Sequence, residues 1–106
     1  MSTTKAPQLI PVQIDFNTAT DHELVAAIPG KTIYVYRFSF KALGAVSVQF
    51  KSGATPLSPL IAYNAGEGWS EEFDTEAYFS CAKGEALNVT LSAAQQVVGM
   101  LYYKLL

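Results

Sequence analysis

Few residues of this chain could perform chemistry. Its 106 residues include one histidine, His22, and one cysteine, Cys81. A Ser-His or Cys-His catalytic pair would have to use His22, which stands between Asp21 and Glu23 beside an expected turn. An exposed turn histidine is the simpler interpretation. No histidine or basic cluster lies near Cys81 in the sequence to favour its thiolate, so we expect Cys81 to be a small buried hydrophobe.

The acidic residues form one dense group, between residues 67 and 76. This segment lacks the regular ligand spacing of a calcium loop, so a solvated acidic turn is favoured over an ion site, which stays open. A spatial pair of carboxylates for glycoside hydrolysis also stays open, although so small a domain has little room for a cleft. The glycines match no phosphate-binding motif. We therefore expect no catalytic residue, no metal site and no cofactor.

Aromatic residues offer a different kind of site. Rings stack on the apolar faces of sugars, so Tyr63 and Trp69 could line a glycan-binding surface. Packing in the core or between subunits is the competing interpretation, and it is favoured.

Composition limits the classes of partner. Half of the residues (50%) are hydrophobic and 15% are charged, with a formal net charge of −2. The seven lysines and arginines are scattered, which argues against nucleic acid. No apolar run approaches the roughly 20 residues of a membrane helix. The first residues lack the apolar stretch of a signal peptide, so we expect synthesis in the cytoplasm. So few charged residues favour either a well-filled core or an apolar surface that is buried against other copies or another protein.

The clearest expected element is a strand over residues 31–40. Its even positions, Tyr34, Tyr36, Phe38 and Phe40, predict one aromatic face, with Arg37 and Ser39 on the other. The Pro29–Gly30 turn before it favours a hairpin with a strand over residues 22–28.

Alternating patterns predict further strands, separated by small polar turns. They cover residues 8–16, 46–51, 61–63, 69–73, 77–82, 86–91 and 96–106, with a loop at residues 55–60. Pro7 and Pro11 confine the first strand to an edge or an irregular extension. The last segment is apolar on both faces, which predicts a central position. About eight strands and no long helix predict an all-β antiparallel sandwich or barrel, with residues 1–16 as an N-terminal arm and residues 17–106 as the sandwich domain.

Three stretches resemble a widespread group of small tailed-phage virion proteins. They are AIPGKTIYVY at residues 27–36, VSVQFKSG at residues 46–53 followed by Thr55-Pro-Leu57, and AKGEALNVTLS at residues 82–92 running to VGMLYY at residues 98–103. The resemblance covers residues 23–106, and GEALNVT is its most distinctive piece. It implies a jelly-roll-like β-sandwich without catalytic residues. It also implies a structural protein, commonly trimeric, that decorates or cements a capsid or sits on a head or tail fibre.

These observations lead to a hypothesis of a capsid decoration protein, located in the virion. Its partners would be the major capsid protein and further copies of itself, as a homotrimer. The expected contacts with the capsid or a neighbour are Thr3, Lys5, Gln8, Ile10, Val12 and Ile14, and the expected subunit interface is Met100, Tyr102 and Leu106. The alternative is a fibre or receptor-binding module that binds a host glycan through Tyr63 and Trp69. Fold alone does not separate the two.

Overall fold

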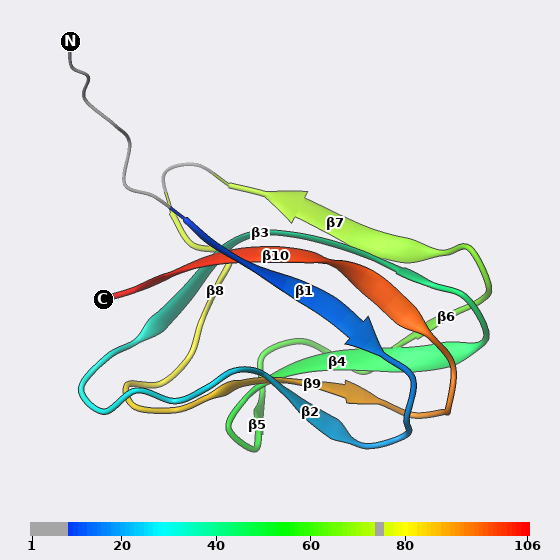
Figure 1. Cartoon of the computed structure of the whole chain (residues 1–106), viewed down its shortest axis with the longest axis horizontal. Helices are drawn as coiled ribbons and strands as arrows, with labels where there is room; N and C mark the ends of the chain where they lie inside the picture. The colour runs from blue at the N-terminus through cyan, green and yellow to red at the C-terminus, as the bar shows by residue number, and fades with distance from the viewer. Residues whose placement is uncertain (1–8, 74–75) are drawn as a thin grey trace, which may run out of the picture.

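A computed structural model describes residues 9–73 and 76–106 of the chain. In this part, ten strands form two antiparallel sheets that pack face to face (Figure 1). Sheet A contains β1 (Ile10–Phe16), β10 (Val97–Leu105), β3 (Ile33–Ala42) and β7 (Gly68–Glu72) in that order, with β8 (Phe79–Ser80) also paired to β3. Sheet B contains β2 (Asp21–Val25), β9 (Leu87–Leu91), β4 (Val46–Ser52) and β5 (Thr55–Pro56), with β6 (Ile61–Tyr63) also paired to β4. The expected antiparallel sandwich is confirmed, and this strand order is compatible with a jelly-roll-like arrangement.

The core lies between the sheets and follows the period-two pattern of the strands. In β4 the buried apolar side chains are Val46, Val48 and Phe50, and in β9 they are Leu87, Val89 and Leu91. Alternate residues of a strand point to opposite faces, so each strand contributes one apolar face to the core. Both predictions of an inward face are confirmed.

Aromatic rings join the two sheets near the centre of this core. Phe38 of β3 packs against Phe50 of β4, with ring centroids 5.2 Å apart. Trp69 of β7 meets the Phe38 ring edge to face at 4.9 Å, and Phe79 of β8 stacks on it at 5.7 Å. Trp69 and Phe79 also contact the Phe50 ring, at 6.2 and 5.3 Å between ring centroids, so these rings fix how sheet A lies on sheet B.

The predicted face of four aromatic residues on β3 is wrong. Tyr102 of β10 pairs with Arg37 but Tyr103 pairs with Val35, so Tyr36 is an extra residue in β3. This β-bulge shifts the alternation by one residue. Ile33 and Val35 point inward before the bulge, and Phe38 and Phe40 point inward after it. Tyr34, which alternates with Ile33 and Val35, is therefore on the opposite side of sheet A.

The predicted hairpin between β2 and β3 is also wrong, because the two strands belong to different sheets. β2 pairs with β9 in sheet B, while β3 pairs with β10 and β7 in sheet A. The expected turn is present: Gly30 has a positive φ of 78°, and the Lys31 N–H donates to the Ile28 carbonyl over 3.1 Å. This turn leads the chain from sheet B to sheet A. β2 pairs with β9 rather than with β3, because β9 offers it an apolar partner strand.

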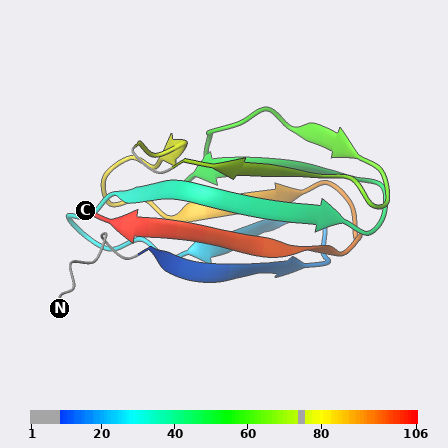
Figure 2. The ribbon, with the colours of Figure 1, turned by 90° about the horizontal axis from the view of Figure 1, so that it is seen from above.

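β1 is part of the sandwich, at one edge of sheet A. It pairs with β10 along its whole length, from Ile10 opposite Tyr103 to Phe16 opposite Val97. Ile14 on its inner side is only 2% exposed. The boundary expected between an arm (residues 1–16) and a sandwich domain (residues 17–106) therefore falls directly after a strand that contributes to the core. β10 lies between β1 and β3 (Figure 2), in the central position that its two apolar faces predicted.

Candidate protein-contact surface

The outer face of sheet A carries two of the predicted interface residues, Met100 and Tyr102. It consists of the side chains of β1, β10, β3 and β7 that point away from sheet B. The strand registers arrange them in four rows across the sheet. The rows are Asp15, Val98, Lys41 and Gly68; Gln13, Met100, Ser39 and Ser70; Pro11, Tyr102, Arg37 and Glu72; and Lys104, Tyr34 and Ser80.

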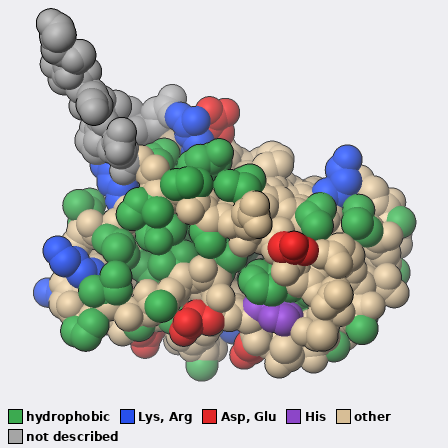
Figure 3. All heavy atoms as spheres, viewed as in Figure 1, with side chains coloured by type: hydrophobic (Ala, Val, Ile, Leu, Met, Phe, Trp, Pro, Cys, Tyr) green, Lys and Arg blue, Asp and Glu red, His purple; other side chains and the backbone are tan. Residues whose placement is uncertain are grey.

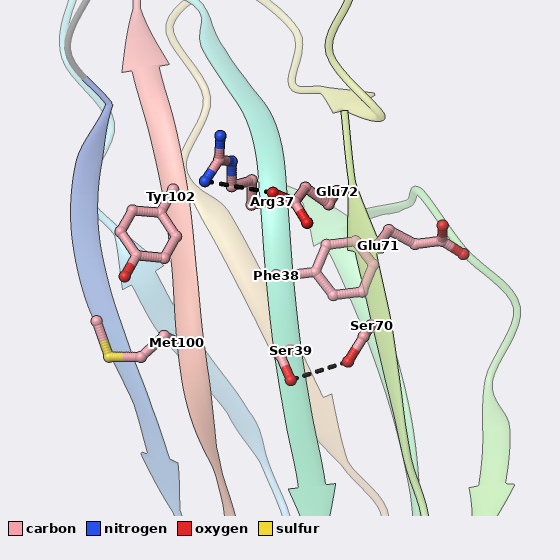
Figure 4. A pocket seen from close by; sticks show the side chains of 8 residues that line it. All are labelled: Arg37, Phe38, Ser39, Ser70, Glu71, Glu72, Met100 and Tyr102. Carbon is pink, nitrogen blue, oxygen red and sulfur yellow. Dashed lines mark hydrogen bonds and ion pairs between the residues drawn. The ribbon is translucent and has the colours of Figure 1, made fainter. Parts of the chain in front are cut away.

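This face is hollowed rather than flat. A depression of about 510 Å³ lies over β3, with Met100 and Tyr102 on one side and Ser70 and Glu72 on the other (Figure 4). Two smaller depressions, of about 300 and 230 Å³, open on the same face around Gly99. The hollow exists because the residue in its middle, Ser39, is small. A side chain from a partner could occupy it.

Polar contacts bridge the hollow on its β7 side. Arg37 forms an ion pair with Glu72, with Nη1 and Oε2 3.4 Å apart, and the Ser70 hydroxyl donates to Ser39 Oγ over 2.9 Å (Figure 4). Exposed pairs of this kind contribute little to stability. Their effect here is to order the polar side chains around the hollow.

A cationic side chain lies over an aromatic ring at one end of the face. The Lys104 ammonium is 5.0 Å from the centroid of the Tyr36 ring. At the other end, Asp15 accepts a hydrogen bond from the Gln96 amide. The bulge that makes Tyr36 an extra residue therefore also adds an aromatic ring to the end of the face that holds Lys104.

The residues predicted to contact a neighbour are divided by the structure. Thr3, Lys5 and Gln8 lie outside the described residues. Ile10, Val12 and Ile14 lie on the inner side of β1: Ile10 is 40% exposed, Val12 is half-buried and Ile14 is buried. Figure 3, which faces the edge of the sandwich formed by β1 and β2, shows hydrophobic side chains gathered over the half where β1 begins and β10 ends. Ile10 is thus the one of these three that a partner could reach directly.

The predicted subunit-interface residues lie on and beside β10. Met100 and Tyr102 share the outer face of sheet A and are half-buried. Leu106 follows the strand and is 63% exposed, while its backbone exchanges hydrogen bonds with that of Thr32. The structure thus brings Met100 and Tyr102 together and places Leu106 at the end of the sheet.

The rings suggested for glycan binding pack against the core. Tyr63 is 8% exposed and meets Phe40 edge to face at 5.4 Å, and burial raises the pKa of its hydroxyl. Trp69 packs on Phe38, and its indole N–H donates to Glu71 over 2.8 Å. Little ring surface at Tyr63 is left on which a sugar could stack.

The residues considered for catalysis are apart from one another. His22 stacks on Phe16 at 4.2 Å, and its Nε2–H donates to the Thr18 carbonyl over 2.9 Å. Cys81 is buried, and this burial raises the pKa of its thiol. In the expected acidic turn, Glu67 accepts the Asn64 N–H over 2.7 Å, while Asp74 lies outside the described residues. Across residues 9–73 and 76–106, no three His, Cys, Asp or Glu side chains form a group that could hold a metal ion.

Comparison with known proteins adds no assignment: no family model and no curated protein matches this chain. No helix in the described part of the chain is long and apolar enough to span a bilayer.

Proposed function

We propose that this chain is a structural protein of a tailed-phage particle, which decorates or cements the shell through protein–protein contacts. The sequence resemblance supports this context. The structural observation that carries the proposal is the position of β1, which forms the second half of the expected N-terminal arm (residues 1–16), at the edge of sheet A. Among the described residues, no strand pairs with β1 on the side away from β10.

An edge strand offers backbone donors and acceptors to another chain. In β1, Pro11 removes one N–H from this set, which limits indiscriminate pairing. Ile10 supplies an exposed apolar side chain beside it. We infer that a shell protein binds along β1, and that residues 1–8 add affinity through their high effective concentration once β1 is bound.

Binding to shells tests this function. Purified full chain is mixed with shells assembled without it and sedimented, together with a variant lacking residues 2–8 and with Ile10→Asp. The truncation ends before β1, so the sandwich stays intact. We expect saturable binding of the full chain and weaker binding of both variants. Leu60→Asp is the matched control, because Leu60 is exposed and follows β5 in sheet B, and it should bind like the full chain.

Failure of the full chain to bind any shell would contradict the proposal. Full occupancy by the truncated variant would exclude a role for residues 2–8. Binding to host cells in place of shells would favour the alternative of a receptor-binding module.

A further inference from the structure

We propose that the outer face of sheet A packs against the same face of a second copy of this chain, about a two-fold axis that runs parallel to the strands between β10 and β3. This surface differs from the β1 edge, so the inference does not depend on binding to a shell. It makes β10 of each copy the ridge that fills the hollow of the other.

The shape of the face is the first argument. The depression of about 510 Å³ lies over β3, and the larger side chains Met100 and Tyr102 stand beside it on β10. A two-fold axis between these strands places β10 over β3 of the partner. Met100 then lies over the small Ser39 of the partner, inside the hollow. Methionine adapts well to such an irregular gap.

The alternative axis, in the same plane but perpendicular to the strands, matches the shape poorly. It would place β10 on β10 of the partner and β3 on β3. Ridge would meet ridge, and the hollow of one copy would face the hollow of the other. Unfilled space between surfaces forfeits the dispersion contacts that favour packing.

The charges of the face are complementary under the proposed axis. The rows stay in register, so Tyr102 lies over Arg37 of the partner and Lys104 lies over Tyr34 of the partner, each a cation beside an aromatic ring. Asp15 lies over Gly68 of the partner. Lys41 of the partner is on the neighbouring strand, a sideways displacement of ~4.8 Å. Each contact occurs twice by symmetry.

The size of the face predicts a weak pair. Four strands at about 4.8 Å spacing and four rows cover roughly 500 Å² of each copy, or about 1,000 Å² in total. That is the lower limit for a specific interface. We therefore expect a concentration-dependent dimer through this face, as an alternative to the homotrimer that the resemblance implies.

A charge exchange tests the pairing in solution, by sedimentation velocity over a wide range of concentration. Asp15→Lys and Lys41→Asp should each weaken association by about tenfold or more, because each sets two like charges against each other. The double variant, which exchanges the two charges, should restore it. Glu23→Lys is the control, since Glu23 is exposed on β2 in sheet B, and it should associate normally.

Cross-linking tests the axis and covers the case of a variant that does not fold. In a Cys81→Ala background, chains with Met100→Cys are mixed with chains with Ser39→Cys. Because facing sheets lie about 10 Å apart, a bismaleimide of about that span is added, and the proposed axis predicts a cross-link between the two kinds of chain. A chain that stays monomeric at every concentration overturns the proposal, as does an oligomer that ignores the charge variants. A Met100→Cys chain that cross-links to Tyr102→Cys in preference to Ser39→Cys overturns the proposed axis.

Discussion

Gly99 of β10 lies directly opposite Phe40 of β3, and there is no room for a side chain between the two strands. A Cβ atom on Gly99 would overlap the Ser39 carbonyl oxygen. On the other side of β3, a Cβ atom on Gly68 would overlap the Phe40 carbonyl. β3 is therefore held closely by both neighbours at this point.

Gly99→Ala should destabilise the sandwich by about 1–3 kcal/mol, because backbone on both strands must move to accept the methyl group. Urea unfolding measures the change. Gly44→Ala is the control: its methyl group would meet the flexible side chain of Gln95, which can turn away, so we expect little change. Equal losses for the two variants would show that the close approach at Phe40 has no energetic consequence.

Ser52 connects β4 to the turn between β8 and β9. Its hydroxyl, in a residue 3% exposed, donates to Glu85 over 2.6 Å and accepts the Ala82 N–H over 2.8 Å. Ser52→Ala removes the hydroxyl, so Glu85 and the Ala82 N–H each lose a hydrogen bond. The free energy of unfolding should fall by about 1–3 kcal/mol. Ser70→Ala, which removes an exposed hydroxyl, should change it by less than about 0.5 kcal/mol. The expectation is contradicted if Ser52→Ala unfolds at the same urea concentration as the parent.

Cys81 should react slowly with thiol reagents in the folded protein. Its side chain is buried, and burial raises the pKa of the thiol, which lowers the thiolate fraction at a given pH. Labelling should therefore accelerate sharply once urea unfolds the chain. The added thiol of Met100→Cys, on the half-buried outer face, provides a comparison and should react sooner. Rapid labelling of native Cys81 would contradict its placement.

Asp21 should contribute a small pH dependence to stability. The Thr90 hydroxyl donates to Asp21 over 2.6 Å and, with Lys51 at 3.4 Å, lowers the pKa of this carboxyl below 3.8. The carboxyl therefore binds its proton less readily in the folded chain than in the unfolded one. Its contribution is present above pH 3.8 and is lost as the pH falls through the lower folded pKa.

Thr90→Val tests this contribution, because it removes the hydrogen bond but keeps the shape of the side chain. Urea unfolding of the variant and the parent is compared at neutral pH and on the acid side of pH 3.8. The variant should be less stable at neutral pH, and the difference should shrink in acid. A difference that stays constant with pH would exclude Asp21 as its source.

The sequence predicts strands well where one alternation runs through the whole element. In β4 and β9 the inward residues follow one parity from end to end, so their buried faces could be predicted. β3 changes parity at Tyr36, and a single period fitted to residues 31–40 groups Tyr34 with Phe38 wrongly. The signal was present: Ile33 and Val35 are as apolar as Phe38 and Phe40 but of opposite parity, which is typical of a bulge.

The pairing of strands was harder to predict than their existence. A Pro-Gly turn shows that the chain reverses near residue 30, but not whether it stays in the same sheet. That choice depends on the partners that β2 and β3 find far away in the sequence, β9 and β10.

Part of the proposed contact surface was indicated by the sequence, since a strand apolar on both faces suggested Met100 and Tyr102. Arg37, Ser39 and Lys41 could not be assigned to the same surface, because that requires the register of β3 against β10. Tyr63 and Trp69 show the opposite case. Their chemistry suits sugar binding, but their exposure is decided by packing against Phe38 and Phe40.

The position of this chain in purified phage particles tests the central claim most directly, that it is a particle protein held by protein–protein contacts. Cryo-electron microscopy of intact particles would give its location and its neighbours. We expect the sandwich on the shell in symmetric copies, with the β1 edge against a shell protein. Particles that contain no copy of this chain, or copies whose β1 edge contacts nothing, would contradict it.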